Sequence, residues 1–186
     1  MTKTATVAAA VRARIRAANR SDLPALKDIL NREIRTSTAS WTTVEKSLAD
    51  MTLWFDDRIA AGHPVLVAEC PATGDVSGYA SYGPFRSGEG YAATVEHSVY
   101  VHHEFRGQGI AACLLDVLIT RAREAGMRLM IGGISSEAEG SRRLHQKMGF
   151  REVGRIPSAG MKFGRSLDLV LMALPLVKGI SGQRLH

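Results

Sequence analysis

Two glycines, Gly107 and Gly109, stand between an apolar, β-rich segment and a segment with helical periodicity. Glycine lets a backbone approach an anion closely, and the first amides of a helix carry unpaired N–H groups at the positive end of its dipole. Arg106, directly before them, adds a delocalised charge with several donors. Residues 106–112 therefore have the chemistry to bind a phosphate or pyrophosphate, although an ordinary surface turn that opens a helix uses the same residues.

Two other phosphate-binding folds fit this loop less well. Gly107, Gly109 and Ala112 match the dinucleotide pattern GxGxxA. However, residues 102–105 separate the loop from the end of the preceding strand, and the next strand ends without an acidic residue for a ribose. A P-loop would need a GK[ST] sequence, which the loop lacks.

The composition predicts a single soluble globular domain over residues 1–186. The chain is 45% hydrophobic and 23% charged, and no apolar run approaches the roughly 20 residues that span a bilayer. The net charge of +6 is scattered and the aromatic content is only 6%, so a solvated surface and an anionic cofactor explain it better than a nucleic acid or a membrane. Cys70 and Cys113 are expected to be reduced core residues, which favours the cytoplasm, and no His/Cys cluster indicates a metal.

The elements that must position the loop follow from periodicity. The Arg-rich start suggests a transit peptide as one alternative, but residues 11–19 alternate apolar and basic side chains, which favours a half-buried first strand. A helix capped by Ser21 or Asp22 follows, and further helices are expected around residues 44–61, 114–126 and 141–149. Strands are expected at residues 63–70, 76–83, 93–101, 127–134 and 166–174, the first two of these as a hairpin. This order predicts an α/β (α+β) fold, a mixed sheet covered by helices.

Several segments together resemble one known family. Arg106, Gly109 and Ala111 match the R/Q-x-x-G-x-G/A loop of the GNAT acetyltransferases. "TVEHSVYV" before the loop, and "SRRLHQKMGF" and "KFGRSLDLVLM" after it, occur in the same order in the branch that contains phosphinothricin and methionine sulfoximine N-acetyltransferases. The resemblance covers roughly residues 11–176. It implies the GNAT fold, whose central sheet is mixed and mostly antiparallel.

The resemblance also implies acetyl-CoA as the acetyl donor. The backbone of Val99, Tyr100 and Val101 would then pair with the pantetheine arm like an added strand. Ala138 stands where the family commonly has an Asn that bonds this arm, whereas Ser141 is kept. The pyrophosphate would bind to Arg106, Gly107, Gln108, Gly109, Ile110, Ala111 and Ala112.

Acetyl transfer to an amine requires a base, because only the neutral amine is a nucleophile. By resemblance Glu96 is this base, and a solvated strand carboxylate is its alternative interpretation. His145 occupies the place where many GNAT enzymes have a Tyr credited with protonating the thiolate. A lone His on a short helix can equally be a packed structural residue. The N–H groups near Val99, exposed by a bulge, would stabilise the oxyanion.

The acceptor is expected to carry an amino acid carboxylate. Arg86 matches the position used for substrate recognition in this branch, and a guanidinium can bind a carboxylate with two hydrogen bonds. An exposed loop arginine is the alternative. Ser166 replaces a common Trp, which puts one wall of the pocket in doubt. Weaker candidates for the acceptor pocket, beside Glu96, are Phe85, Tyr91, Lys162 and Phe163.

The sequence therefore predicts an acetyl-CoA-dependent N-acetyltransferase that acts on the α-amine of a small amino acid analogue, without a metal. Two alternatives remain open: a GNAT enzyme acting on a peptide N-terminus or a polyamine, and a non-catalytic module that senses CoA. A homodimer is expected from the resemblance alone, with no nucleic acid and no membrane as partners.

Overall fold

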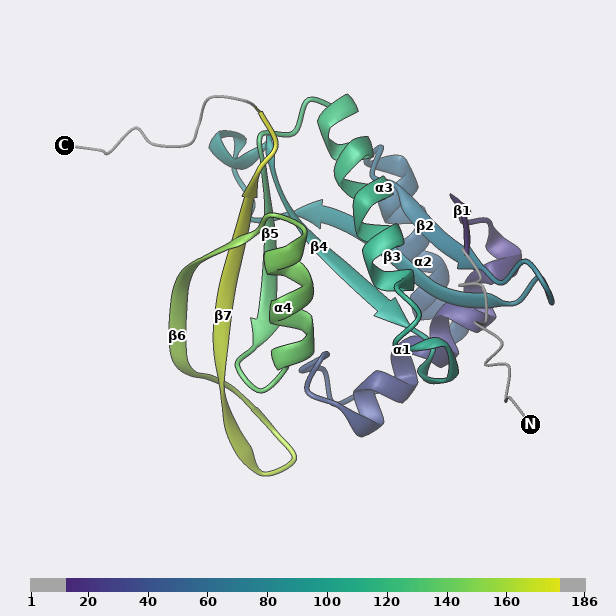
Figure 1. Ribbon diagram of the computed structural model, residues 1–186, viewed down its shortest axis with the longest axis horizontal. Coiled ribbons are helices and arrows are strands. Elements are labelled where there is room, and N and C mark those ends of the chain that lie inside the picture. Colours follow the sequence, from purple (N-terminus) through teal and green to yellow (C-terminus); the bar gives the residue numbers. More distant parts are fainter. Residues whose placement is uncertain (1–12, 178–186) are drawn as a thin grey trace, which may run out of the picture.

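The computed structural model describes residues 13–177, which form a seven-stranded sheet with helices on both faces (Figure 1). The strands lie in the order β1-β2-β3-β4-β5-β7-β6. Neighbouring strands are antiparallel except β4 and β5, which are parallel. The predicted mixed, mostly antiparallel sheet is therefore confirmed. Within residues 13–177 no helix has the length and apolar character to cross a membrane.

The elements follow the predicted order closely. The strands are β1 (Arg14–Ala17), β2 (Val65–Glu69), β3 (Val76–Pro84), β4 (Thr94–Val101), β5 (Leu129–Ser135), β6 (Arg151–Lys162) and β7 (Arg165–Pro175). The helices are α1 (Leu23–Thr36), α2 (Leu48–Ala60), α3 (Ile110–Glu124) and α4 (Glu139–Lys147). The predicted β2–β3 hairpin is confirmed by its antiparallel pairing. The predicted first strand began at Val11, which lies outside the described residues.

Each face of the sheet has its own core. On one face, Leu114 and Leu118 of α3 are fully buried against strand residues such as Val95 and Met130. On the other face, α1 and α2 cover Val67 and Tyr79 (Figure 1). Because side chains alternate along a strand, successive residues of β4 point into different cores. This alternation separates the functional side chains of β4 into two groups.

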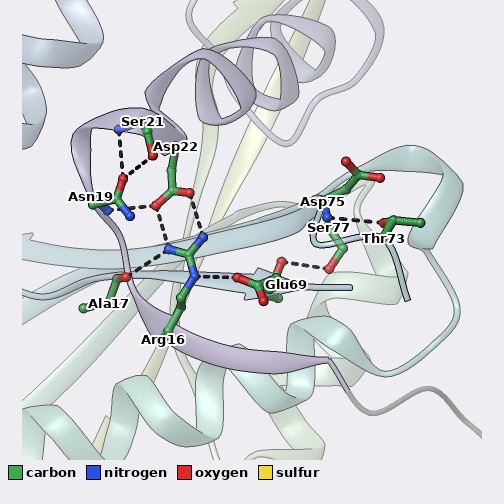
Figure 2. A network of polar contacts seen from close by, with 10 residues as sticks. Arg16, Ala17, Asn19, Ser21, Asp22, Glu69, Thr73, Asp75 and Ser77 are labelled. Atoms are coloured by element: carbon green, nitrogen blue, oxygen red, sulfur yellow. Dashed lines mark hydrogen bonds and ion pairs between the residues drawn. The ribbon is translucent and has the colours of Figure 1, made fainter. Parts of the chain in front are cut away.

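The entry into α1 is held by an ion-pair network (Figure 2). The Arg16 guanidinium donates to Asp22 through two bonds of 2.7 and 2.8 Å and to Glu69 through one bond of 2.7 Å. Asn19, rather than Ser21 or Asp22, caps this turn, because its side chain accepts the Ser21 N–H while Asp22 accepts the Asn19 N–H. The predicted cap is therefore corrected: Asp22 joins β1 to the helix and makes no side-chain cap bond to α1.

The edge strand β6 is missing from the sequence-based prediction. Its pairing with β7 is interrupted between Ile156 and Gly160, and Ser158 in that bulge has a φ of 52°. Nearly all of its residues are exposed. Because the strand buries neither face, it shows no apolar alternation in the sequence, and only its hydrogen bonds to β7 define it.

Candidate active site

The centre of the sheet opens between β4 and β5. The two strands pair over Thr94, Val95 and Glu96 only. Beyond this point β4 continues along β3 and β5 continues along β7, so the facing edges of residues 97–101 and 132–135 are not paired with each other. We call this gap the β4–β5 cleft. The predicted bulge near Val99 is not present, because the β3–β4 register is continuous there, and strand separation exposes the backbone instead.

Two cavities meet at β4. The β4–β5 cleft holds a cavity of about 90 Å³ whose lining includes His97, Val99, Ala138, Ser141 and His145. A second cavity, of about 420 Å³, lies between α1, α2 and the sheet. Ser98 and Tyr100 line both cavities. The predicted strand residue Tyr100 therefore lies where the two cavities meet, and Val99 lines the first of them. The sequence did not predict the second cavity, between α1, α2 and the sheet.

The predicted phosphate loop follows β4 and opens α3. Gly109 precedes α3 with a φ of 79°, in the left-handed region that favours glycine, and Gly107 has a φ of 76°. The first helical bond is donated by the Cys113 N–H to the Gly109 carbonyl. The amides of Ile110, Ala111 and Ala112 therefore lack helical acceptors, as expected at a helix N-terminus. Gln108 turns its side-chain amide to the Glu104 carbonyl at 3.4 Å.

Arg106 extends away from this loop toward α1. Its guanidinium pairs with Glu33, whose side chain is only 5% exposed. The Ser37 hydroxyl donates to the other Glu33 oxygen at 2.6 Å. About half of the Arg106 side chain stays exposed, so part of its donor set faces solvent. Arg106 thus ties the loop to α1, a contact that the sequence did not indicate.

Glu96 extends from the sheet face that α1 and α2 cover. A Cβ atom at Gly133 on β5 would lie 2.9 Å from Glu96 Oε1, so glycine makes room for this carboxylate. The side chain is reachable from solvent, yet the surrounding protein is dense enough that burial raises the pKa of Glu96. A raised pKa is a property of a carboxylate that exchanges protons.

His145 and the neighbouring His97 form a buried pair in the β4–β5 cleft. Their Nε2 atoms are 3.0 Å apart, and the rings stack with centroids 5.0 Å apart. The Nδ1 of His145 lies 2.7 Å from the Ser141 carbonyl oxygen, and the Ser141 hydroxyl is 3.5 Å from the same nitrogen. Burial lowers the pKa of both imidazoles, that of His97 to about 3. His97 was missed in the sequence, although it directly follows Glu96.

Ala138 and Ser141 lie at the start of α4, which brings them to the cleft. Ala138 directly precedes the helix and lines the cavity, so the methyl group occupies the position that the family commonly gives to Asn. Ser141 lies one turn before His145 and binds it through its carbonyl. The structure therefore brings together cleft residues that are about 40 positions apart in the sequence.

Three of the predicted acceptor residues, in the loop after β3, form a cluster at the start of β4. Phe85 donates its N–H to the Thr94 carbonyl at 3.2 Å, which keeps the loop next to the start of β4. The Tyr91 ring packs edge-on against Phe85 at 6.2 Å, and the Arg86 guanidinium lies over the same ring at 5.2 Å. Arg86 and Tyr91 are exposed, so this cluster remains accessible.

Lys162 and Phe163 have other surroundings. Lys162 is 3% exposed, and its ammonium bonds the main-chain carbonyls of Glu33 and Ser40. It therefore braces β6 against the segment after α1. Phe163 is exposed at the β6–β7 turn with a φ of 52°. Neither side chain lines the cleft or the second cavity.

Arg58 of α2 is a second guanidinium that the sequence did not single out. It lies over Gly83, where any side chain would collide with it, and Gly83 is the partner of Glu96 in the β3–β4 register. Among the described residues its Nε is buried without a hydrogen-bond partner, and burial lowers its pKa. The sequence did not indicate this position of Arg58, because the helix around it shows only the ordinary periodicity of core residues.

The separated parallel strands, the adjoining helix N-terminus and the Glu96 carboxylate with its raised pKa define an acyltransferase site. The chain belongs to the acetyltransferase (GNAT) family, whose model matches residues 26–150. It is 46% identical to an L-methionine sulfoximine/L-methionine sulfone acetyltransferase from Pseudomonas aeruginosa, over 88% of this chain and 95% of that protein. No group of three or more metal-ligating side chains gathers within residues 13–177.

Two solved structures are similar over nearly the whole chain. One is a phosphinothricin acetyltransferase from Sinorhizobium meliloti in complex with acetyl-CoA, with a TM-score of 0.88, 34% identity and 92% of each chain covered. The other is a ribosomal-protein-alanine N-acetyltransferase from Brucella melitensis, with a TM-score of 0.85, 43% identity, and 87% of this chain and 99% of that chain covered. The relatives thus share the reaction type and differ in the named acceptor.

Proposed function

We propose that this protein is an acetyl-CoA-dependent N-acetyltransferase that acetylates the α-amine of a small amino acid analogue of the methionine sulfoximine or phosphinothricin type. The main support for this proposal is that two cavities meet at Ser98 and Tyr100 of β4, the strand that also contains Glu96. A transferase needs two binding spaces that meet at the reacting atoms. The named acceptors of the relatives support the substrate class.

The β4–β5 cleft fits acetyl-CoA, which supplies the acetyl group as a thioester. The edge of β4 at residues 99–101 is not paired with β5, and the backbone groups of Val99 and Val101 that face this edge can exchange hydrogen bonds with the amides of a pantetheine arm. The free amides of residues 110–112 and the exposed glycines before them suit a pyrophosphate. Main-chain groups carry both interactions, so the missing side chain at Ala138 does not prevent binding.

Glu96 would act as the base. Its raised pKa makes the carboxylate a stronger proton acceptor than an ordinary glutamate, so it can take a proton from an ammonium. It lies on the same sheet face as the second cavity. The acceptor would therefore approach from the α1–α2 side while the donor occupies the cleft.

Two arginines can hold the acceptor's carboxylate. Arg86, which the sequence suggests for substrate recognition, is exposed in the loop next to the start of β4. Arg58 covers Gly83, directly opposite Glu96, and facing positions in such a pair are about 4.5–5.5 Å apart at Cβ. A carboxylate held here would place an α-amine close to Glu96, because one carbon separates the two groups. A polyamine offers no such carboxylate.

A second candidate is acetylation of a peptide N-terminus, favoured by the similarity to the Brucella ribosomal-protein-alanine acetyltransferase. Thiol release from acetyl-CoA distinguishes the candidates when methionine sulfoximine, phosphinothricin, an alanine-terminated peptide and spermidine are compared. We expect the highest kcat/KM with the two free amino acids. Preference for the peptide would support the second candidate, and CoA binding without release from any amine would indicate a sensor.

The same proposal covers the remaining expectations from the sequence. We propose one catalytic domain with its core at residues 11–176, a homodimer and a cytoplasmic location. Cys70 and Cys113 are free thiols, in agreement with a reducing compartment, but the prediction that they are core residues is wrong, because Cys70 is only partly buried and Cys113 is exposed. Sedimentation of the purified protein tests the dimer.

A further inference from the structure

The hydrogen bonds of His145 determine where its proton lies. Its Nδ1 is 2.7 Å from the Ser141 carbonyl oxygen, and a carbonyl can only accept. Nδ1 must therefore carry the hydrogen. A neutral imidazole has one N–H, so the Nε2 of His145 has a lone pair and acts as an acceptor.

His97 supplies the donor for that acceptor. Its Nε2 is 3.0 Å from the Nε2 of His145, so this nitrogen must carry the hydrogen of His97. The Nδ1 of His97 is then unprotonated, and it is buried without a hydrogen-bond partner among residues 13–177. The pair is thus a chain that runs from His97 through His145 to the Ser141 carbonyl. It presents no N–H to the cleft.

Packing keeps the two rings in this arrangement. Phe150 lies edge-on against both, with ring centroids 5.4 Å from His97 and 5.1 Å from His145. On the other side, a Cβ atom at Gly132 would be 3.0 Å from His97 Nε2 and 3.3 Å from His145 Nε2. Neither ring can turn without moving a buried neighbour.

Protonation of His145 would break the chain. A hydrogen on its Nε2 would face the hydrogen on His97 Nε2, and His97 could avoid this only by moving its proton to Nδ1, where no described acceptor lies. Burial lowers the pKa of both rings, and within residues 13–177 the one ionisable group that acts on His97 is His145. Glu96, the next residue along, points from the opposite face of β4.

We propose that His97 is a positioning residue that holds His145 as the neutral Nδ1–H tautomer and so withholds it from acid catalysis. The inference rests on the proposed acetyl transfer. In that reaction the amine nitrogen bonds to the carbonyl carbon, the C–S bond breaks, and its electron pair leaves on sulfur. The nitrogen loses one proton to Glu96 before attack, and Glu96 releases it to solvent. The nitrogen loses a second proton after attack, and this proton reaches the sulfur directly or through water, with none supplied by His145.

Nuclear magnetic resonance of the intact protein with ¹⁵N-labelled histidine tests the tautomers without turnover. We expect His145 to show protonated Nδ1 and His97 to show protonated Nε2 at pH 7, and the pKa of each ring to lie below the ordinary 6.5 of histidine. A protonated Nε2 on His145, or its titration near neutral pH, would overturn the proposal. If no amine is acetylated but these signals are found, the proposed function fails and the histidine arrangement stands.

Two variants at His97 separate the effect of its hydrogen bond to His145 from the effect of its packing. His97→Gln keeps an N–H donor at about the same reach, whereas His97→Leu removes it and leaves His145 Nε2 free to bind a proton. We expect the pKa of His145 to be higher in His97→Leu than in His97→Gln, while burial keeps it below the ordinary 6.5 in both variants. The same behaviour in both variants would contradict the proposal.

Kinetics of His145→Gln give a readout that holds even if His97→Leu does not fold. Loss of a general acid typically costs about 100- to 10,000-fold in rate. We expect a fall in kcat of less than about tenfold and an unchanged basic side of the pH profile. A larger fall together with loss of a basic limb would assign the acid role to His145 after all.

Discussion

Gly132 on β5 is the position where the β4–β5 cleft is most sensitive to one added methyl group. In Gly132→Ala the new Cβ would lie 3.0 Å from His97 Nε2 and 3.3 Å from two atoms of His145. Both rings are buried, and Phe150 and the Ser141 carbonyl prevent their retreat. The backbone here is ordinary for an L-residue, so the clash is the whole native-state effect.

Two opposing contributions determine how much Gly132→Ala changes the free energy of unfolding. Overpacking a core typically costs about 1–3 kcal/mol, and replacing glycine by alanine returns about 0.4–1 kcal/mol by restricting the unfolded chain. We therefore expect Gly132→Ala to be less stable by about 1–2 kcal/mol. For a chain of this size each kcal/mol shifts Tm by about 2–4 °C, so Tm should fall by about 2–8 °C.

Gly154→Ala is the matched control. Gly154 is also a strand glycine, but a Cβ atom there meets nothing within 4 Å. Its Tm should stay the same or rise slightly, because only the unfolded-state effect remains. Thermal unfolding followed by circular dichroism measures both variants. If Gly132→Ala were as stable as Gly154→Ala, the two histidine rings would not be rigidly held, and the argument from packing would be refuted.

Three further perturbations test the site and the fold. Glu96→Gln should lower kcat/KM by about 100- to 10,000-fold near neutrality, with the loss shrinking as the pH approaches the pKa of the acceptor amine; an unchanged pH–rate profile would remove Glu96 as the base. Arg86→Ala or Arg58→Met should raise the acceptor KM by about 10- to 150-fold, whichever side chain holds the carboxylate, without changing acetyl-CoA binding. Equal loss of both would indicate a structural arginine. Arg16 lowers the pKa of Asp22 below its ordinary 3.8, so Asp22→Asn should lower Tm at pH 7, and the difference should disappear as the pH falls through the native pKa; a constant difference in acid would contradict this role.

The proposed donor half of the site could be predicted from the sequence because its residues are close together along the chain. Glu96, the following strand residues and the glycine loop lie in one uninterrupted strand–loop–helix segment. The positive φ of Gly107 and Gly109 and the open helix N-terminus follow from residue type and order alone. The hairpin and buried strands were predictable for the same reason, since short-range patterns specify them.

Tertiary structure decided the contacts between distant residues. The parallel β4–β5 register and its early end bring His97 next to His145, 48 positions away, and no local pattern encodes that distance. Arg106, placed by its motif in the phosphate loop, instead pairs with Glu33 from a helix 73 positions earlier. These partners arise because helix packing and strand register join separate segments, and a buried charge then binds whichever partner the fold supplies.

The sequence by itself determined the family, the fold class and the run of backbone groups suited to a cofactor. The proton that each imidazole carries, and the position of Arg58 over Gly83, depended on the packed structure. Hydrogen-bond direction is set by the atoms that face one another, as at His145 and the Ser141 carbonyl. The type of a residue determines which hydrogen bonds its side chain can donate or accept. The surrounding fold determines which of these hydrogen bonds form.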